Sequence, residues 1–110
     1  PRVDILASET QIVLEIELPG VCKEDIAARV DDEGSSVTIE GTYPERAEGE
    51  LKRVYDERRT EAGAAFSRTI PLPGAVDKES VRAKLADGIL TITLAKVQVE
   101  EPQGTPVNIE

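Results

Sequence analysis

Apolar and polar residues alternate along several short stretches of this chain. The clearest is residues 11–18, QIVLEIEL, which is followed by a Pro-Gly pair. The same period of two returns at residues 26–30, 37–39 and 90–94. Successive side chains of a β-strand point to opposite faces, so this alternation predicts four strands that each bury one face.

Residues typical of tight turns separate these predicted strands. The stretch DDEGSS lies between two of them at residues 31–36, and Asp87-Gly88 comes just before the last. Glycine tolerates the positive φ that a tight hairpin turn requires. Short alternating strands with frequent turns predict an all-β sandwich or barrel. Because Tyr43, Tyr55 and Phe66 are the only aromatic residues, we expect an aliphatic core.

Two segments depart from the alternating pattern. In residues 76–88, VDKESVRAKLADG, Asp77 can cap a run of good helix formers and Gly88 can end it, so local signals alone predict a helix. Between Tyr43 and Ala65 runs a long charged connection whose large apolar side chains are Leu51, Val54 and Tyr55. A connection of this length in a compact domain usually has a function or makes contacts elsewhere.

Composition and charge narrow the class of protein. The 110 residues fit one small domain, and a formal net charge of −9 opposes binding to phosphate backbones and anionic lipid. We therefore expect neither nucleic acid nor a membrane as a partner. Cys22 is the single cysteine and no apolar run reaches the roughly 20 residues of a membrane span, so we expect a cytoplasmic protein. Because the chain lacks Met and starts at Pro1, we also expect a fragment of a longer protein.

The residues needed for common catalytic chemistry are missing. The sequence has no His, which excludes Ser-His-Asp and Cys-His catalysis, and it has no glycine motif that cradles phosphate. The acidic run Asp31, Asp32 and Glu33 fits a hairpin turn and lacks the spaced ligands of a calcium loop. We expect no enzyme activity and no cofactor or metal ion.

The last residues carry a separate signal. Residues 98–110 are polar and interrupted by proline and glycine, yet Val107 and Ile109 stand one residue apart. Branched side chains at alternate positions point the same way only in an extended backbone. The pair is typical of a strand that binds another segment, and the alternative is a frayed end.

Three stretches together resemble the α-crystallin domain of small heat-shock proteins of the Hsp20 type. They are residues 1–26, PRVDILASETQIVLEIELPGVCKEDI, residues 66–73, FSRTIPLP, and residues 84–96, KLADGILTITLAK, with Gly88, Leu90 and Lys96 at the family's positions. The resemblance implies an immunoglobulin-like antiparallel β-sandwich over residues 1–97, with a long inter-strand dimerisation loop at 43–65 and a flexible C-terminal extension at 98–110. It also implies a strand, not a helix, at residues 81–85.

The resemblance implies a dimer made by the long loop. A strand around Leu51 to Tyr55 would cross to the neighbouring subunit, and a solvated loop is the alternative. Arg68 shares strand parity with Phe66 and Ile70, so it would meet a carboxylate from the partner's loop or extend to the surface. The predicted dimer interface is Leu51, Val54, Tyr55 and Arg68.

The resemblance also assigns a role to Val107 and Ile109. In the family, an Ile/Val-x-Ile/Val segment docks as an added strand into an apolar groove of another subunit. In this sequence the groove would be lined by Ile26, Ala28, Val30, Val81, Ala83 and Leu85.

The implied function is that of an ATP-independent holdase, which binds destabilised proteins and prevents their aggregation. Its partners would be copies of itself, in a homodimer and higher homo-oligomers, and unfolding client proteins. The alternative is a CS-type co-chaperone module that recruits a partner chaperone and holds no client. The FSRTIPLP stretch and the terminal Val-x-Ile favour the holdase.

Overall fold

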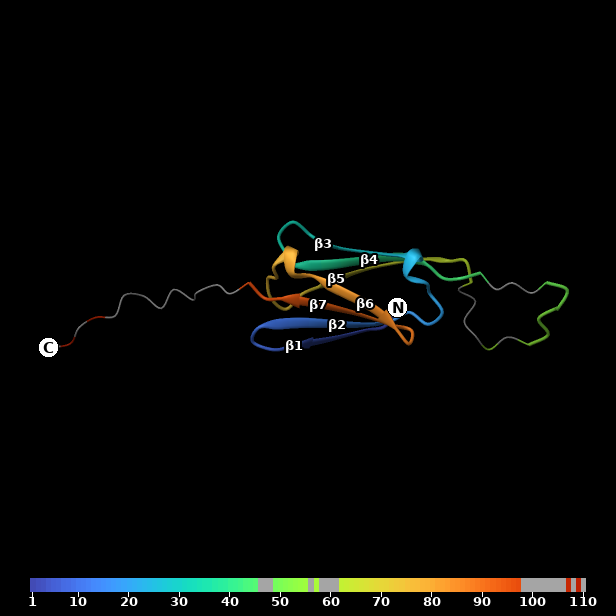
Figure 1. Cartoon of the computed structure of the whole chain (residues 1–110), viewed down its shortest axis with the longest axis horizontal. Coiled ribbons are helices and arrows are strands. Elements are labelled where there is room, and N and C mark those ends of the chain that lie inside the picture. The colour runs from blue at the N-terminus through green and yellow to red at the C-terminus, as the bar shows by residue number, and fades with distance from the viewer. Residues whose placement is uncertain (46–48, 56, 58–61, 98–106, 108, 110) are drawn as a thin grey trace.

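A computed structural model of the chain describes residues 1–45, 49–55, 57, 62–97, 107 and 109. These residues form strands and two short 3₁₀ turns, and none of them lies in an α-helix (Figure 1). The strands are β1 (Val3–Ala7), β2 (Gln11–Glu17), β3 (Ile26–Val30), β4 (Ser36–Thr42), β5 (Ala65–Pro71), β6 (Arg82–Ala86) and β7 (Ile89–Ala95). The 3₁₀ turns are η1 (Lys23–Asp25) and η2 (Lys78–Ser80).

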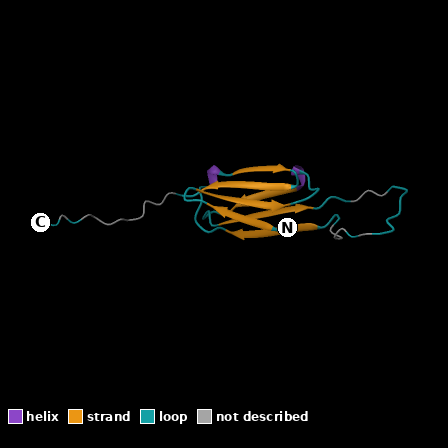
Figure 2. Ribbon diagram, turned by 90° about the horizontal axis from the view of Figure 1, so that it is seen from below, coloured by secondary structure: helices purple, strands orange, loops and turns teal. Residues whose placement is uncertain are grey.

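The strands form two antiparallel sheets that pack face to face (Figures 1 and 2). The larger sheet has the order β1-β2-β7-β6 and the smaller has the order β3-β4-β5. The core between them is aliphatic apart from Phe66, as expected. It consists of Ile12, Leu14, Ile16, Leu18, Val21, Val37, Ile39, Phe66, Ile70, Val76, Leu90, Ile92 and Leu94. The prediction of an all-β antiparallel sandwich is confirmed.

The four strands predicted from alternation correspond to β2, β3, β4 and β7. Strand β1 is not among them, although Val3, Ile5 and Ala7 do alternate. These residues pair with Ile16, Leu14 and Ile12 of β2, so they lie on the core side of the larger sheet. The alternation is hard to recognise because Leu6, on the opposite face, is also apolar.

The helix that local signals predict at residues 76–88 is wrong. A single turn forms at η2, where the Asp77 carboxylate accepts a hydrogen bond of 3.0 Å from the Glu79 backbone N–H. The chain then enters β6, which pairs with β7 from Arg82 opposite Thr93 to Ala86 opposite Ile89. This ladder outweighs the weak preference of a short segment for helix. The strand that the family resemblance implies is therefore confirmed.

Both predicted turns connect strands as expected. Asp87 and Gly88 join β6 to β7 with φ values of 54° and 76°, which are the positive values of a two-residue hairpin turn. The DDEGSS stretch joins β3 to β4, and Asp31 holds it together. Its carboxylate accepts hydrogen bonds from the backbone N–H groups of Ser35 and Ser36, at 2.7 and 3.3 Å, and from their hydroxyls, at 2.7 and 3.1 Å.

The hydrogen bonds to Asp31 stabilise its ionised form. The bond from the Ser35 hydroxyl has the largest effect, followed by the bond from the Ser35 N–H, and together with those from Ser36 they lower the pKa of Asp31 from 3.8 to about 2. A carboxyl group whose pKa is lower in the folded chain contributes stability above its ordinary pKa. That contribution is lost as the pH falls from 3.8 to about 2.

We predict that the β3–β4 turn loosens over this acidic range. The backbone amide signals of Ser35 and Ser36 should titrate in NMR spectra with a midpoint near pH 2. Asp31→Asn should remove this titration, whereas Asp32→Asn, which changes a neighbouring exposed carboxylate, should leave it intact. A midpoint at the ordinary value of 3.8 would show that these hydrogen bonds do not stabilise the carboxylate.

Candidate docking site

An apolar pocket lies between the edge strands β3 and β6, which belong to opposite sheets. Each of these strands pairs with a single neighbour, β4 or β7. The pocket has a volume of about 220 Å³ and is lined by Ala28, Arg29, Val30, Val37, Lys78, Val81, Ala83 and Ile92. It is therefore bordered by two strands whose outer backbone edges are unpaired among the described residues.

Strand register brings the apolar lining together. On the smaller sheet, Ala28 and Val30 lie opposite the core residues Ile39 and Val37. On the larger sheet, Ala83 lies opposite Ile92, which has 0% of its surface exposed. Alanine is small, so Ala28 and Ala83 leave space above the core where larger side chains would close it.

Four of the six predicted groove residues line this pocket: Ala28, Val30, Val81 and Ala83. The other two, Ile26 and Leu85, are not in its lining. Both are half-buried and pack against the core, as Val30 and Val81 also do. The sequence analysis missed Val37, Ile92, Arg29 and Lys78. Val37 and Ile92 lie across the ladder from Val30 and Ala83, so a correct register would have identified them.

The turn η2 fixes the start of β6 beside the pocket. The Ser80 hydroxyl donates a hydrogen bond of 2.7 Å to the Asp77 carbonyl and accepts one of 3.0 Å from the Ala95 backbone N–H on β7. The Asp77 N–H in turn donates to the Ala95 carbonyl at 2.9 Å. These bonds tie η2 to β7. The larger sheet therefore determines where Lys78 and Val81 lie at the pocket.

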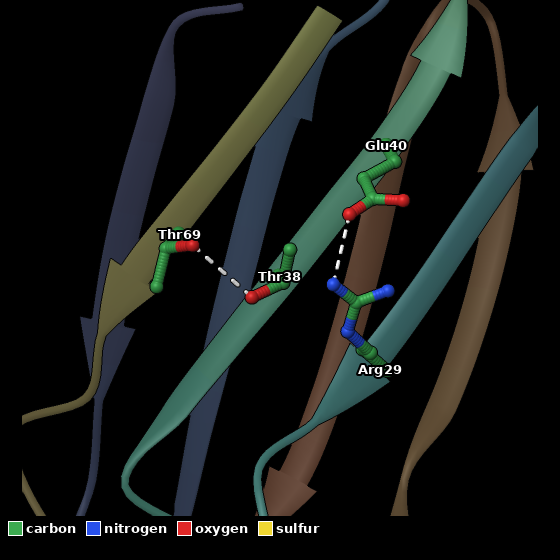
Figure 3. A network of polar contacts seen from close by, with 4 residues as sticks. All are labelled: Arg29, Thr38, Glu40 and Thr69. Atoms are coloured by element: carbon green, nitrogen blue, oxygen red, sulfur yellow. Dashed lines mark hydrogen bonds and ion pairs between the residues drawn. The ribbon is translucent and has the colours of Figure 1, made fainter.

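The polar part of the rim comes from two basic residues. Arg29 lies on β3 and its guanidinium donates to the Glu40 carboxylate on β4 at 2.8 Å (Figure 3). This pair lies on the outer face of the smaller sheet, together with a hydrogen bond of 3.1 Å between the Thr38 and Thr69 hydroxyls. Arg29 thus extends away from the core, and Lys78 supplies the other positive charge at the pocket.

Val107 and Ile109, the predicted docking residues, are described although most residues around them are not. Their side chains are 84% and 92% exposed. Within this single chain they therefore contact neither the core nor the pocket. The rest of the predicted extension, residues 98–106, 108 and 110, lies outside the described residues.

The predicted dimer residues are also at the surface. Leu51, Val54 and Tyr55 are 79%, 95% and 75% exposed, and residues 49–55 form no strand in the single chain. The Tyr55 hydroxyl donates a hydrogen bond of 2.7 Å to Glu57, which raises the pKa of Tyr55. Arg68 has a partner that the sequence did not suggest, because its guanidinium donates to the Pro1 carbonyl at 2.6 Å.

The chemistry of this site is that of binding. An apolar pocket beside unpaired backbone edges suits an extended segment that adds as a strand and buries alternate side chains. Among the described residues, no three His, Cys, Asp or Glu side chains gather where they could hold a metal ion. No helix of the described chain is long and apolar enough to cross a membrane.

Comparisons with known proteins agree with this architecture. The model of the Hsp20/alpha crystallin family matches residues 4–110. Small heat shock protein C4 of Rickettsia felis is 38% identical over 96 residues, which are 87% of this chain and 56% of that protein. Heat shock protein 16 of Schizosaccharomyces pombe is 33% identical over 101 residues, 89% of this chain and 67% of that protein. The chain thus spans between about half and two thirds of the length of these relatives.

Solved structures show the same fold. Heat shock protein 16.0 from Schizosaccharomyces pombe superposes with a TM-score of 0.78 at 30% identity, covering 100% of this chain and 97% of that chain. A small heat-shock protein from Xylella fastidiosa, reported to have a distinct high order structure, superposes with a TM-score of 0.69 at 28% identity, covering 99% of this chain and 96% of that chain. These relatives give no support to a CS-type adaptor. The chain belongs to the Hsp20/alpha crystallin family, whose members it resembles in sequence and in fold.

Proposed function

We propose that this chain is the α-crystallin domain and C-terminal extension of an ATP-independent holdase. The observation that carries the proposal is the apolar pocket between the unpaired edges of β3 and β6. Such a site binds extended apolar segments and makes or breaks no covalent bond. The relatives named above are heat shock proteins, which supports a chaperone function.

Holdase activity predicts a direct effect on aggregation. When a model client is heated with a molar excess of this chain and without ATP, light scattering should stay well below that of the client alone. Adding ATP should make no difference. If scattering falls only after a partner chaperone is added, the adaptor function is the correct one and the holdase proposal is wrong.

We propose that the first occupant of the pocket is the Val107–Ile109 segment of another copy. Burying a Val and an Ile side chain contributes roughly 3 to 6 kcal/mol in total. Ordering several tail residues, at about 1 to 2 kcal/mol each, offsets most of this gain. One tail therefore binds weakly, and several tails in one assembly act together through their effective concentration. Such an assembly holds together, yet it exposes apolar pockets whenever a tail dissociates.

This tail docking predicts which substitutions dissolve large assemblies. Replacing both Val107 and Ile109 by Gly should leave species no larger than a dimer, while Asn108→Ser should have little effect. Ala83→Glu should mimic the tail variant, because a docked tail would remove water from the new carboxylate, which costs a few kcal/mol. Ala27→Glu is the matched control, since it introduces the same charge on the outer face of β3, away from the pocket. Unchanged mass of the Gly variant by light scattering would contradict tail docking.

We further propose that the long loop joins two copies. Its exposed Leu51, Val54 and Tyr55 need an apolar surface, and strand β1 offers one at an edge where no strand of the described residues lies beside it. Ile5 lies on the core side of β1 but is 46% exposed, so a segment of a second copy can cover it. A strand added at this edge would also satisfy the unpaired backbone groups of β1.

The loop proposal predicts a folded monomer after deletion of residues 45–58. The core lies outside these residues, so circular dichroism should still report a β-sandwich. Sedimentation at micromolar concentration should show a dimer for the intact chain and a monomer for the deleted one. A deleted chain that remains dimeric would mean that the copies pair through a different surface.

A further inference from the structure

The outer face of the larger sheet has opposite charges at its two sides. Two successive rows of outward side chains cross the sheet from β1 to β6. One row is Asp4, Glu15, Thr91 and Lys84, and the next is Leu6, Val13, Thr93 and Arg82. Acidic groups thus occupy β1 and β2, and basic groups occupy β6.

This distribution of charges does not stabilise the single chain. Asp4 and Glu15 are direct cross-strand neighbours, and like charges in that position are destabilising. Arg82 and Lys84 likewise share one face of β6. None of the four makes an ion pair with any described residue. Each side of the face therefore presents two like charges that have no ion-pair partner in the described part of the chain.

We propose that this outer face packs against the same face of a second copy. Two identical faces that meet are related by a two-fold axis lying between them. If the axis runs parallel to the strands, β6 of one copy lies over β1 of the other. Each row of side chains then faces the same row of the second copy, running in the opposite direction. Lys84 of each copy then lies over Asp4 of the other copy, twice in the interface.

An axis perpendicular to the strands fits the charges less well. It would place β1 over β1 and β6 over β6, so that the acidic side of each copy faces the acidic side of the other. In the favoured arrangement, Arg82 lies over Leu6, whose side chain is 47% exposed and can take the aliphatic part of the arginine. Val13 and Thr93 then meet in the middle of the face. The net charge of −9 disfavours any contact that lacks such ordered charges.

The size of the face indicates how strong this contact is. Four strands about 4.8 Å apart and about five residues long give a footprint of roughly 300 Å² per copy. A stable interface needs about 800 Å² per partner. The contact is thus too small to hold two free copies together, and it orders copies that other contacts already hold close. It uses none of the residues of the proposed tail docking and loop exchange.

Zero-length cross-linking tests this packing directly. A carbodiimide joins a carboxylate to an amine that touches it. Within one chain Asp4 and Lys84 lie three strand spacings apart, about 14 Å, so a bond between them has to join two copies. In a mixture of ¹⁴N- and ¹⁵N-labelled full chain near millimolar concentration, mass spectrometry should find hybrid peptides that join Asp4 to Lys84.

Variants give the expected size of the effect. Each exposed ion pair changes an equilibrium constant by about 1.5-fold to fivefold, so loss of the two symmetric pairs should weaken the contact by about 2-fold to 25-fold. Asp4→Asn should therefore lower the yield of hybrid peptides joining Glu15 to Lys84 of the second copy, because both reacting groups of that cross-link remain in this variant. The exchanged variant, Asp4→Lys with Lys84→Asp, should regain the cross-link between positions 4 and 84. Lys23→Gln is the control, because Lys23 lies on η1, away from this face.

Two results would overturn the proposal. One is the absence of a hybrid peptide joining positions 4 and 84 from both the natural and the exchanged chain, when circular dichroism shows both to be folded. The other is equal coupling of Asp4 to Lys23, Lys84 and Lys96, which would indicate random collisions.

Discussion

The aliphatic layer between the two sheets is the interaction on which the rest of this structure depends. Strands β2 and β7 contribute six of its side chains: Ile12, Leu14, Ile16, Leu90, Ile92 and Leu94. Each is at most 5% exposed, and full burial of such a side chain is worth roughly 1.5 to 3 kcal/mol. Both strands lie inside the larger sheet and have neighbours on both sides. The stability of the fold is thus concentrated in its middle, which leaves the four edge strands free for contacts with other segments.

The unequal size of the sheets determines where apolar surface stays exposed. Four strands face three, so the inner face of the larger sheet is not fully covered. Ile5 lies opposite the fully buried Leu14 in the β1–β2 ladder, yet almost half of the surface of Ile5 remains accessible. At the other side, the alanines of β3 and β6 leave a pocket over Val37 and Ile92. Both surfaces follow from the packing of the core itself, and neither requires a strained backbone.

The central strands could be predicted from the sequence because their signal is local. In residues 11–18 and 90–94 the alternation of apolar residues directly records which face is buried. The same local reasoning failed at residues 76–88, where β6 forms because β7 offers it a ladder, and propensity contains no information about that neighbour. The family resemblance supplied the missing strand. It could not supply the bond from Arg68 to the Pro1 carbonyl, which joins residues 67 positions apart through a backbone group.

The predicted groove shows the same limit of reasoning from local sequence. Alternation indicated the inward residues of β3 and the family resemblance indicated those of β6, but neither tells how far a groove extends. The pocket is lined by alanine and valine of these strands, and the larger Ile26 and Leu85 lie outside its lining. The extent of the pocket depends on the sizes of side chains from both sheets. Predicting that extent therefore requires the strand register of both sheets. Predicting such a pocket therefore needs the pairing of strands that are distant in sequence.

The loop and the tail, each proposed to contact another copy, leave the sandwich at opposite ends. Strand β4 ends and β5 begins at the end where the long loop extends, whereas β7 ends at the other, next to η2 (Figure 1). The pocket shares Lys78 with η2, so it lies towards the end from which the tail departs. A loop that pairs two copies and a tail that links pairs therefore do not compete for the same surface. Because the tail contact alone is weak, an assembly built from both can release and rebind tails without unfolding the core, and the free energy of the core is not reduced by making the edges available.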